Sequence, residues 1–330
     1  MGLDDPVTVT KVEQIGETRG FSGRVTRVCL DGAPAGSVVL KRPSADPAVR
    51  GLIRSFGLER RETHFYRHIA PDCPIRLPRI LGVGEGSDGP VLVLEDLSAA
   101  RPGDSHAGIA PDDAGPVFDE IARLHAHWWG RAVPGVPGLG DGPDVAAFHE
   151  RCWPTFAQRF GSELPAPLLK AGRGAGVVLA RARHRLAAEP ATLLHGDLRL
   201  DNILFPDVGA PVFLDWQMVR RGAGAFDLAY LATGSLTSHR PDEMHRLVEG
   251  YRSALVAAGV IGYPTATAWR DYRVAMLFLF ARTVTAGASL GFAEGVARER
   301  FSRALGRWVG AAAGCGALDA LLQGRLPEDP

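Results

Sequence analysis

The residues with the clearest chemical potential lie in residues 193–217, LLHGDLRLDNILFPDVGAPVFLDWQ. His195, Asp197, Asn202 and Asp215 stand there beside short apolar runs that are typical of buried strands. A buried carboxylate is costly unless it is paired, hydrogen-bonded or bound to a metal, so these acids and amides need a shared partner. A metal-bound polyphosphate is one such partner.

Phosphoryl transfer is the chemistry that the spacing favours. It needs a proton acceptor for the attacking hydroxyl, ligands for magnesium and a cation on the nucleotide phosphates. The interval from Asp197 to Asn202 is that of the kinase catalytic loop, and Asp215 ends an apolar run where kinases place a magnesium-binding Asp. Taken alone, each residue has a simpler structural explanation: Asp197 would cap a turn, Asn202 would form an Asx-turn and Asp215 would end a strand. The joint spacing, with NILF and PVFLD forming a hairpin between the two expected metal ligands, favours catalysis.

The cation is expected on an upstream strand, and Lys41 in VVLKRP has that position. Glu59 and Glu62 lie one turn apart on the helix expected next. We predict Glu62 as the partner of Lys41, because Phe65 and Tyr66 after it would anchor that face in the core. The alternative for Lys41 is a solvated lysine at a strand edge. If Lys41 serves only to position phosphate, Lys41→Met should cost little stability.

A glycine-rich segment, IGETRGFSGRVTRV, precedes this strand and can cover phosphates with backbone N–H groups. Gly20, Ser22 and Gly23 are the expected contacts. The spacing does not fit G-x-G-x-x-G, so a glycine hairpin without a ligand is the alternative.

The elements around these motifs change character near residue 97. Before it, RVTRVCL, SVVLKRP and GPVLVLEDL are predicted strands, and a helix between the last two is weakened at Gly57, which allows two shorter pieces. After it, the apolar spacing predicts long helices near residues 167–188, 242–258, 264–290 and 293–313. This order indicates a small β-rich lobe followed by a larger helical one.

The composition is that of a globular protein with no charge preference for a macromolecular partner. Among 330 residues, 37 are Lys or Arg and 37 are Asp or Glu, so nothing attracts nucleic acid or an anionic membrane. The four cysteines lack metal-ligand spacing and are expected to be reduced core thiols. The first residues lack a targeting pattern, and VAMLFLFA is too short to cross a bilayer, so we expect a cytoplasmic location and a core helix there.

The order of motifs resembles the aminoglycoside phosphotransferase and choline kinase-like superfamily, and within it the ecdysteroid kinase-like small-molecule kinases. The resemblance rests on the glycine segment, Lys41, Glu62, LEDL, LHGDLRLDN, LDWQ and GAFDLAYL, over about residues 12–310. His-Gly-Asp, Asp-Trp and the lack of an Ala-Pro-Glu segment separate the chain from protein kinases. The resemblance implies a protein kinase-like, two-lobed α+β fold. A nucleotide-binding lobe would span 1–97 with a hinge at about 94–98, and a helical lobe with the catalytic loop and acceptor site would span 98–330.

The resemblance also implies cofactors and the residues that hold them. Asp197 would be the catalytic base, Asn202 and Asp215 would be the Mg²⁺ ligands, and Lys41 with Glu62 would clamp the phosphates of ATP.

Further residues acquire roles from the same resemblance. The adenine would lie against the connection between the lobes, next to Glu95 and Leu97. Asp227 in FDLAYL corresponds to a position that braces the catalytic loop, and His195 would orient that loop by hydrogen bonds. His125 is expected to be a satisfied core histidine.

The resulting prediction is an ATP- and Mg²⁺-dependent kinase that phosphorylates a hydroxyl group of a small molecule. Nine arginines against six acidic residues in residues 242–307 argue against a polycationic acceptor. We therefore expect a neutral or anionic one: a steroid-like alcohol, a sugar or a hydroxyacyl thioester. The alternatives are an aminoglycoside-type antibiotic phosphotransferase and a nucleotide-binding pseudokinase, although the residues that pseudokinases usually lack are all present. The sequence does not indicate an oligomeric state.

Overall fold

The computed structural model describes residues 7–15, 23–289 and 295–327, and the chain divides into two compact units. Unit 1 contains residues 1–102 and 201–219, and unit 2 contains residues 103–200 and 220–330. The sequence predicted a single division near residue 97. The structure differs because residues 201–219 form a hairpin whose strand pairs with residues 101–102. What each lobe does remains a prediction.

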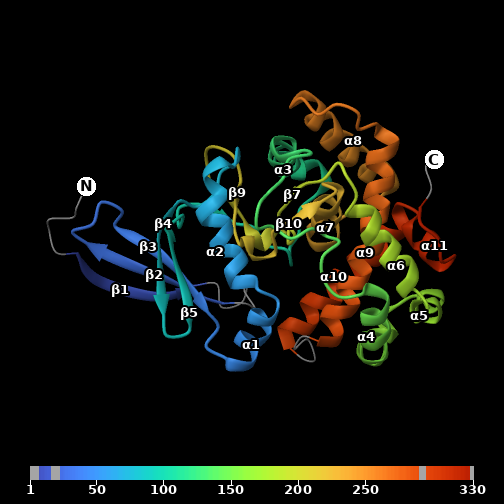
Figure 1. The fold of residues 1–330 in the computed structure, drawn as a ribbon, viewed down its shortest axis with the longest axis horizontal. Helices are drawn as coiled ribbons and strands as arrows, with labels where there is room; N and C mark the ends of the chain where they lie inside the picture. The colour runs from blue at the N-terminus through green and yellow to red at the C-terminus, as the bar shows by residue number, and fades with distance from the viewer. Residues whose placement is uncertain (1–6, 16–22, 290–294, 328–330) are drawn as a thin grey trace. The chain divides into compact units, whose positions relative to one another are not determined.

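Unit 1 is built on a five-stranded antiparallel sheet in the order β1-β2-β3-β5-β4 (Figure 1). The strands are β1 Thr8–Ile15, β2 Gly23–Asp31, β3 Ser37–Pro43, β4 Ile80–Gly86 and β5 Gly89–Glu95. A second sheet in the order β6-β8-β9 comprises β6 Arg101–Pro102, β8 Ile203–Phe205 and β9 Val212–Phe213.

The helices of unit 1 break at a glycine, so this region forms the two shorter pieces that the sequence allowed. Helix α1 is Pro47–Ser55, α2 is Leu58–His68, and Gly57 between them adopts φ 66°, a left-handed conformation that suits glycine. Helix α2 packs on β4 and β5, and its Phe65 and Tyr66 are buried. The face predicted to be anchored in the core is therefore the buried face.

Unit 2 is mostly helical. Its helices are α3 Gly115–Trp128, α4 Val145–Phe160, α5 Ala166–Gly172, α6 Gly176–Leu186, α7 Ala225–Ser235, α8 Pro241–Ala257, α9 Thr265–Ser289, α10 Gly295–Gly314 and α11 Ala317–Leu322. Helix α9 packs against α4, α6, α7, α8, α10 and α11, and VAMLFLFA lies at its buried centre. A two-stranded sheet joins β7 Thr192–Leu194 to β10 Arg220–Gly222. The predicted α+β class, with a β-rich and a helical part, is confirmed.

Several local predictions need correction. The helix expected over residues 167–188 is two helices, because a turn at residues 173–175 interrupts it. Helix α4 was not predicted, since Pro154 stands inside it, and its start is fixed by Asp144, whose carboxylate accepts a hydrogen bond from the Ala147 N–H at 2.9 Å. Strand β4 was not predicted either, because its three glycines interrupt the apolar pattern of a strand. The helix expected to begin at residue 293 is described only from Gly295.

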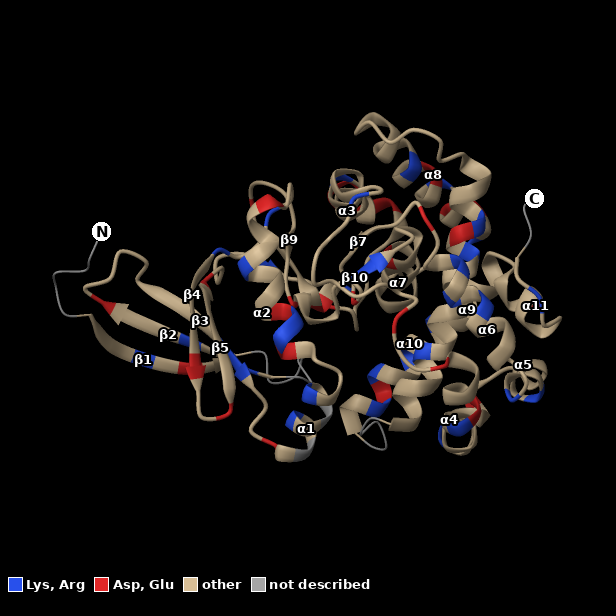
Figure 2. Ribbon diagram, in the orientation of Figure 1, with Lys and Arg blue, Asp and Glu red and all other residues tan. Residues whose placement is uncertain are grey.

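Acidic and basic residues occur along the elements of both units (Figure 2). Over the whole chain, 37 Lys and Arg balance 37 Asp and Glu. Among the described residues, no helix is long and apolar enough to cross a bilayer. None of the four cysteines, all of which lie in the described ranges, forms a disulfide bond. Cys152 and Cys315 are core thiols as expected, but Cys29 and Cys73 are only half-buried.

Candidate active site

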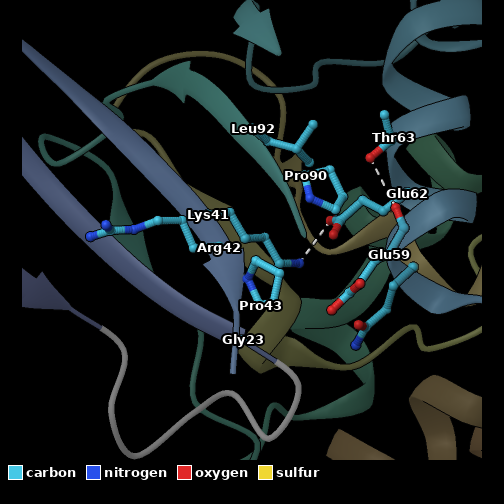
Figure 3. Close-up of a pocket in the computed structure, with 10 residues that line it drawn as sticks. Gly23, Lys41, Arg42, Pro43, Glu59, Glu62, Thr63, Pro90 and Leu92 are labelled. Carbon is cyan, nitrogen blue, oxygen red and sulfur yellow. Dashed lines mark hydrogen bonds and ion pairs between the residues drawn. The ribbon is translucent and has the colours of Figure 1, made fainter. Parts of the chain in front are cut away.

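A cluster of opposite charges forms around Lys41 inside unit 1. The Lys41 ammonium donates to Glu62 Oε1 at 2.7 Å and to Asp215 Oδ1 at 2.8 Å. Figure 3 shows Lys41 and Glu62 facing each other. Glu59, the alternative partner considered from the sequence, has its carboxylate 3.8 Å from Arg54 Nε instead. Three segments that are far apart in the sequence thus meet at one ammonium group.

This cluster is largely removed from water. The side chains of Lys41, Glu62 and Asp215 are 15%, 6% and 19% exposed. Burial alone would lower the pKa of Lys41, but the charges of Asp215 and Glu62 outweigh it and raise that pKa. Lys41 is therefore a largely buried cation paired with two carboxylates, which contradicts the alternative of a solvated lysine at a strand edge.

Stacking of aromatic side chains fixes the distance between Glu62 and Asp215. Phe65 lies one turn after Glu62, and its ring stacks on Trp216 with centroids 4.1 Å apart and an interplanar angle of 4°. The backbone N–H of Trp216 also donates to the Glu62 carboxylate. The residue that follows Asp215 is thereby attached to the helix that carries Glu62.

The backbone at Asp215 is unusual. It adopts φ 62° and is the one residue other than glycine with positive φ among those that the structure describes. Such a conformation costs about 1–3 kcal/mol and persists where its surroundings hold it, which often occurs at functional sites.

The two predicted metal ligands lie at the same end of one hairpin. Asn202 directly precedes β8, and Asp215 follows β9 with Leu214 between them. The backbone N–H of Leu214 donates to the Asn202 carbonyl at 2.8 Å. No group of three or more His, Cys, Asp or Glu side chains with metal-binding geometry occurs in the described part of the chain. One carboxylate and one amide fit Mg²⁺ that takes its remaining ligands from water and phosphates, as Mg²⁺ usually does, better than a metal held by protein alone.

A small cavity borders the cluster (Figure 3). It is lined by residues that include Gly23, Lys41, Glu59, Glu62 and Gln217, and its volume of ≈ 30 Å³ suits water rather than a nucleotide. A Cβ at Gly23 would lie 2.7 Å from the Arg42 carbonyl, so this predicted phosphate contact must be glycine for close backbone approach. The other two, Gly20 and Ser22, lie outside the described residues.

The expected adenine contacts, Glu95 and Leu97, have partners within unit 1. Glu95 Oε2 accepts from Arg76 Nη2 at 2.7 Å and from the Arg79 N–H at 3.1 Å. The Leu97 carbonyl accepts from the Ala100 N–H at 2.9 Å in a turn. Any contact that these residues make with a base would therefore use other backbone groups.

The loop that carries Asp197 lies in unit 2 and is held by Asp227. The two carboxylate oxygens of Asp227 accept hydrogen bonds from the backbone N–H of His195 at 2.6 Å and from the backbone N–H of Gly196 at 2.9 Å. Gly196 has φ 80°, which lets both N–H groups point to one carboxylate. His195 Nδ1 in turn accepts from the Asp197 N–H at 3.3 Å. Asp227 and His195 thus make the loop contacts expected of them.

His125 is a satisfied core histidine, as expected. It is fully buried, and its ring nitrogens lie 2.7 Å from the Tyr251 hydroxyl and 3.3 Å from Asp227 Oδ2. Asp227 is therefore itself positioned by the core of unit 2.

The Asp197 carboxylate is surrounded by donors and cations from three segments of unit 2. Tyr230 on α7 donates a hydrogen bond to it, and Arg199 Nε lies 3.8 Å from Oδ2. Burial would raise the pKa of Asp197, but Arg199, the Tyr230 hydroxyl, His195 and Arg282 together lower it below its usual 3.8. Asp197 is therefore ionised at neutral pH.

Residues 17–272 match the model of the phosphotransferase enzyme family. The chain belongs to this family. No curated protein sequence matches it. Membership makes the protein an enzyme that transfers phosphoryl groups, so both units carry parts of a phosphotransferase.

Solved structures with the same fold include antibiotic phosphotransferases. The chain is 18% identical to a macrolide 2′-phosphotransferase from Brachybacterium faecium, with a TM-score of 0.51 over 91% of this chain and 94% of that one. It is 16% identical to an aminoglycoside 2′-phosphotransferase-IIIa bound to GDP, with a TM-score of 0.58 over 93% of each. An aminoglycoside phosphotransferase from Alicyclobacillus acidocaldarius is 14% identical, with a TM-score of 0.53 over 96% and 93%. At these identities the likeness establishes the fold.

Three residues of this phosphotransferase were missed from the sequence: Arg199, Tyr230 and Arg282. Tyr230 lies three residues after Asp227, so helical spacing puts both on one face of α7 and could have indicated it. Arg282 is 5.3 Å from the centroid of the Tyr230 ring. Nothing local in the sequence of α9 distinguishes it from the other arginines there.

Proposed function

We propose that the protein is an ATP- and Mg²⁺-dependent kinase that phosphorylates a hydroxyl group of a small molecule. The observation that carries the proposal is the contact of Lys41 with both Glu62 and Asp215. It places a cation that can bind phosphates beside Asp215, the proposed metal ligand, whose backbone conformation is strained. Relatives of the same fold have been solved with GDP and with ADP, which supports a nucleotide as donor.

The proposed reaction assigns one task to each group. The acceptor oxygen forms a bond to the γ-phosphorus of ATP, the bond from that phosphorus to the β,γ-bridging oxygen breaks, and ADP leaves. Asp197 accepts the hydroxyl proton, and Lys41, oriented by Glu62, holds phosphate oxygens. Asn202 and Asp215 would hold Mg²⁺, which supplies charge neutralisation on the phosphates. Gly20, Ser22 and Gly23, with Glu95 and Leu97, are proposed as further nucleotide contacts.

The identity of the acceptor is the open part of the proposal. The solved relatives include enzymes for macrolides and aminoglycosides, which keeps an antibiotic acceptor as the second candidate. We favour a neutral or anionic acceptor, but the count of arginines supports this less than expected. Arg246 pairs with Asp242, Arg298 pairs with Glu163 and Arg307 donates to backbone carbonyls, so their charges are used elsewhere. Arg282 is the C-terminal arginine that acts on Asp197.

Large aromatic side chains of unit 2 could line an apolar acceptor pocket, but most of them belong to the core. Trp128, Trp153, Tyr272, Phe278 and Phe280 are all buried. Placement among the ecdysteroid kinase-like enzymes and a cytoplasmic location remain predictions.

The direct test is ADP release in a coupled assay with ATP, Mg²⁺ and a panel of hydroxyl compounds, antibiotics included. Phosphorylation of a small molecule supports the proposal. Binding of ATP without ADP release for any acceptor would favour the pseudokinase.

We expect Asp215→Ala to weaken the binding of nucleotide in the presence of Mg²⁺, because the metal loses its anionic ligand. Lys41 keeps its contact with Glu62, so the fold should persist. Titration calorimetry of ADP with and without Mg²⁺ measures the effect. Asp207→Ala is the matched control, since Asp207 is exposed in the turn at the other end of the same hairpin. An unchanged Mg²⁺ dependence in Asp215→Ala would remove Asp215 as a metal ligand.

We expect Tyr230→Phe to move the acid limb of the kcat/KM profile to higher pH. The Tyr230 hydroxyl lowers the pKa of Asp197, so its loss raises that pKa and the base is protonated at a higher pH. Arg199, Arg282 and His195 still act on Asp197 and limit the change. Tyr272→Phe removes a buried phenol elsewhere in unit 2 and should leave the profile in place. An unmoved limb in Tyr230→Phe would show that the hydroxyl does not act on the base.

A further inference from the structure

Arg282 is held against two aromatic rings beside the proposed base. Its guanidinium carbon lies 5.4 Å from the centroid of Phe226 and 5.3 Å from that of Tyr230, and these rings meet edge to face with centroids 5.9 Å apart. Phe226 and Tyr230 lie one turn apart on α7, so the helix presents both to Arg282 on α9. Cation–π contacts of this kind hold a guanidinium in place without using its hydrogen-bond donors.

The donors of Arg282 are not used by the described protein. Its N–H groups make no hydrogen bond or ion pair with any residue in 7–15, 23–289 or 295–327. This differs from Arg246, Arg298 and Arg307, whose guanidinium groups bind carboxylates or carbonyls. A planar guanidinium that is held in place while its donors are unused can bind a carboxylate or phosphate with two parallel hydrogen bonds.

Asp197 and Arg282 are linked through one phenol. The Tyr230 hydroxyl donates to the Asp197 carboxylate, and the ring of Tyr230 makes the cation–π contact with Arg282. Asp197, Arg199, Tyr230 and Arg282 are all partly exposed, and they present two positive charges and one negative charge. Asp227 adds no free negative charge there, since it is fully buried and accepts backbone N–H groups with both oxygens.

We infer that the acceptor carries a carboxylate or phosphate group close to its reactive hydroxyl, and that Arg282 binds this anion. The inference rests on the proposed function, because a hydroxyl that gives its proton to Asp197 must lie within hydrogen-bond distance of it. Substituents a few bonds away then lie in the field of Arg282 and Arg199. A polycationic acceptor would place ammonium groups beside these cations and is disfavoured.

The experiment uses pairs of acceptors in which one member carries an anionic group and the other is neutral. They are hydroxy acids with their carboxamides and sugar phosphates with the free sugars, and kanamycin serves as a polycation. Each compound is measured for ADP release with ATP and Mg²⁺, and for binding to the ADP-loaded protein by saturation-transfer NMR. The anionic member of at least one pair should bind and exceed its neutral partner in kcat/KM by about 10- to 100-fold, the worth of a charged hydrogen-bonded contact. The preferred pair distinguishes carboxylate from phosphate.

Arg282→Gln should reduce kcat/KM of the anionic member to that of its neutral partner. Arg246→Gln removes the same charge from an exposed position of α8 and should keep the preference. Thermal unfolding of both variants checks the fold. The inference is wrong if neutral compounds or kanamycin react as well as anions, or if no anionic compound binds. It is also wrong if Arg282→Gln slows all acceptors equally, since the guanidinium would then serve the transferred phosphate.

Failure of the kinase proposal gives a different result. An anionic compound that binds in an Arg282-dependent manner, with no ADP release, would retain the anion site and overturn the proposed reaction.

Discussion

Asp197→Asn is expected to abolish phosphoryl transfer while the nucleotide still binds. The amide has nearly the shape of the carboxylate but cannot accept the hydroxyl proton, and loss of a positioned general base lowers turnover by about 10²- to 10⁴-fold. The proposed nucleotide ligands Lys41, Asn202 and Asp215 belong to unit 1, and Asp197 belongs to unit 2. Turnover and ADP affinity should therefore separate in this variant.

Steady-state ADP release and calorimetric titration of ADP with Mg²⁺ measure the two quantities. Asp112→Asn, an exposed position before α3, removes one carboxylate of unit 2 without touching the loop and is the control. A loss of ADP affinity in Asp197→Asn as large as that in Asp215→Ala would exchange the proposed roles of the two residues.

The sequence was informative where a local pattern determines a contact. Phe65 and Tyr66 identified the buried face of α2, and Glu62 rather than Glu59 meets Lys41 as a result. Gly57 indicated a break because only a residue without Cβ adopts its conformation easily. The interval between Asn202 and Asp215 indicated a hairpin because apolar residues flank a turn-forming segment.

Contacts between distant segments were not predictable in this way. Lys41 and Asp215 are 174 residues apart, and the stacking of Trp216 on Phe65 that brings them together is a tertiary event. Arg282 is positioned by two aromatic rings on another helix, so the residues next to it in the sequence do not indicate its position. The position of residues 201–219 in unit 1 likewise depends on strand pairing with residues 101–102.

Lys41→Met is expected to lower turnover by about 10²-fold or more, since a preorganised cation on the phosphates is lost. The structure corrects the expectation that stability would be kept. Lys41 is the cation between Glu62 and Asp215, and without it two largely buried carboxylates face each other. Removing one partner of a buried ion pair costs about 3–5 kcal/mol, a large part of the stability of a typical domain. Chemical denaturation should show this loss directly.

The double variant Lys41→Met/Glu62→Gln separates the two effects. Glu62→Gln removes one of the two opposed charges, so the double variant should recover much of the free energy of unfolding lost in Lys41→Met. Turnover should not recover, because the cation is still missing. Glu62→Gln alone should slow turnover less than Lys41→Met, since the ammonium remains and loses only its orientation. Lys170→Met, at an exposed position of α5, controls for loss of a lysine. If Lys41→Met retains both wild-type turnover and wild-type stability, the Lys41 cluster neither supports the fold nor binds phosphate.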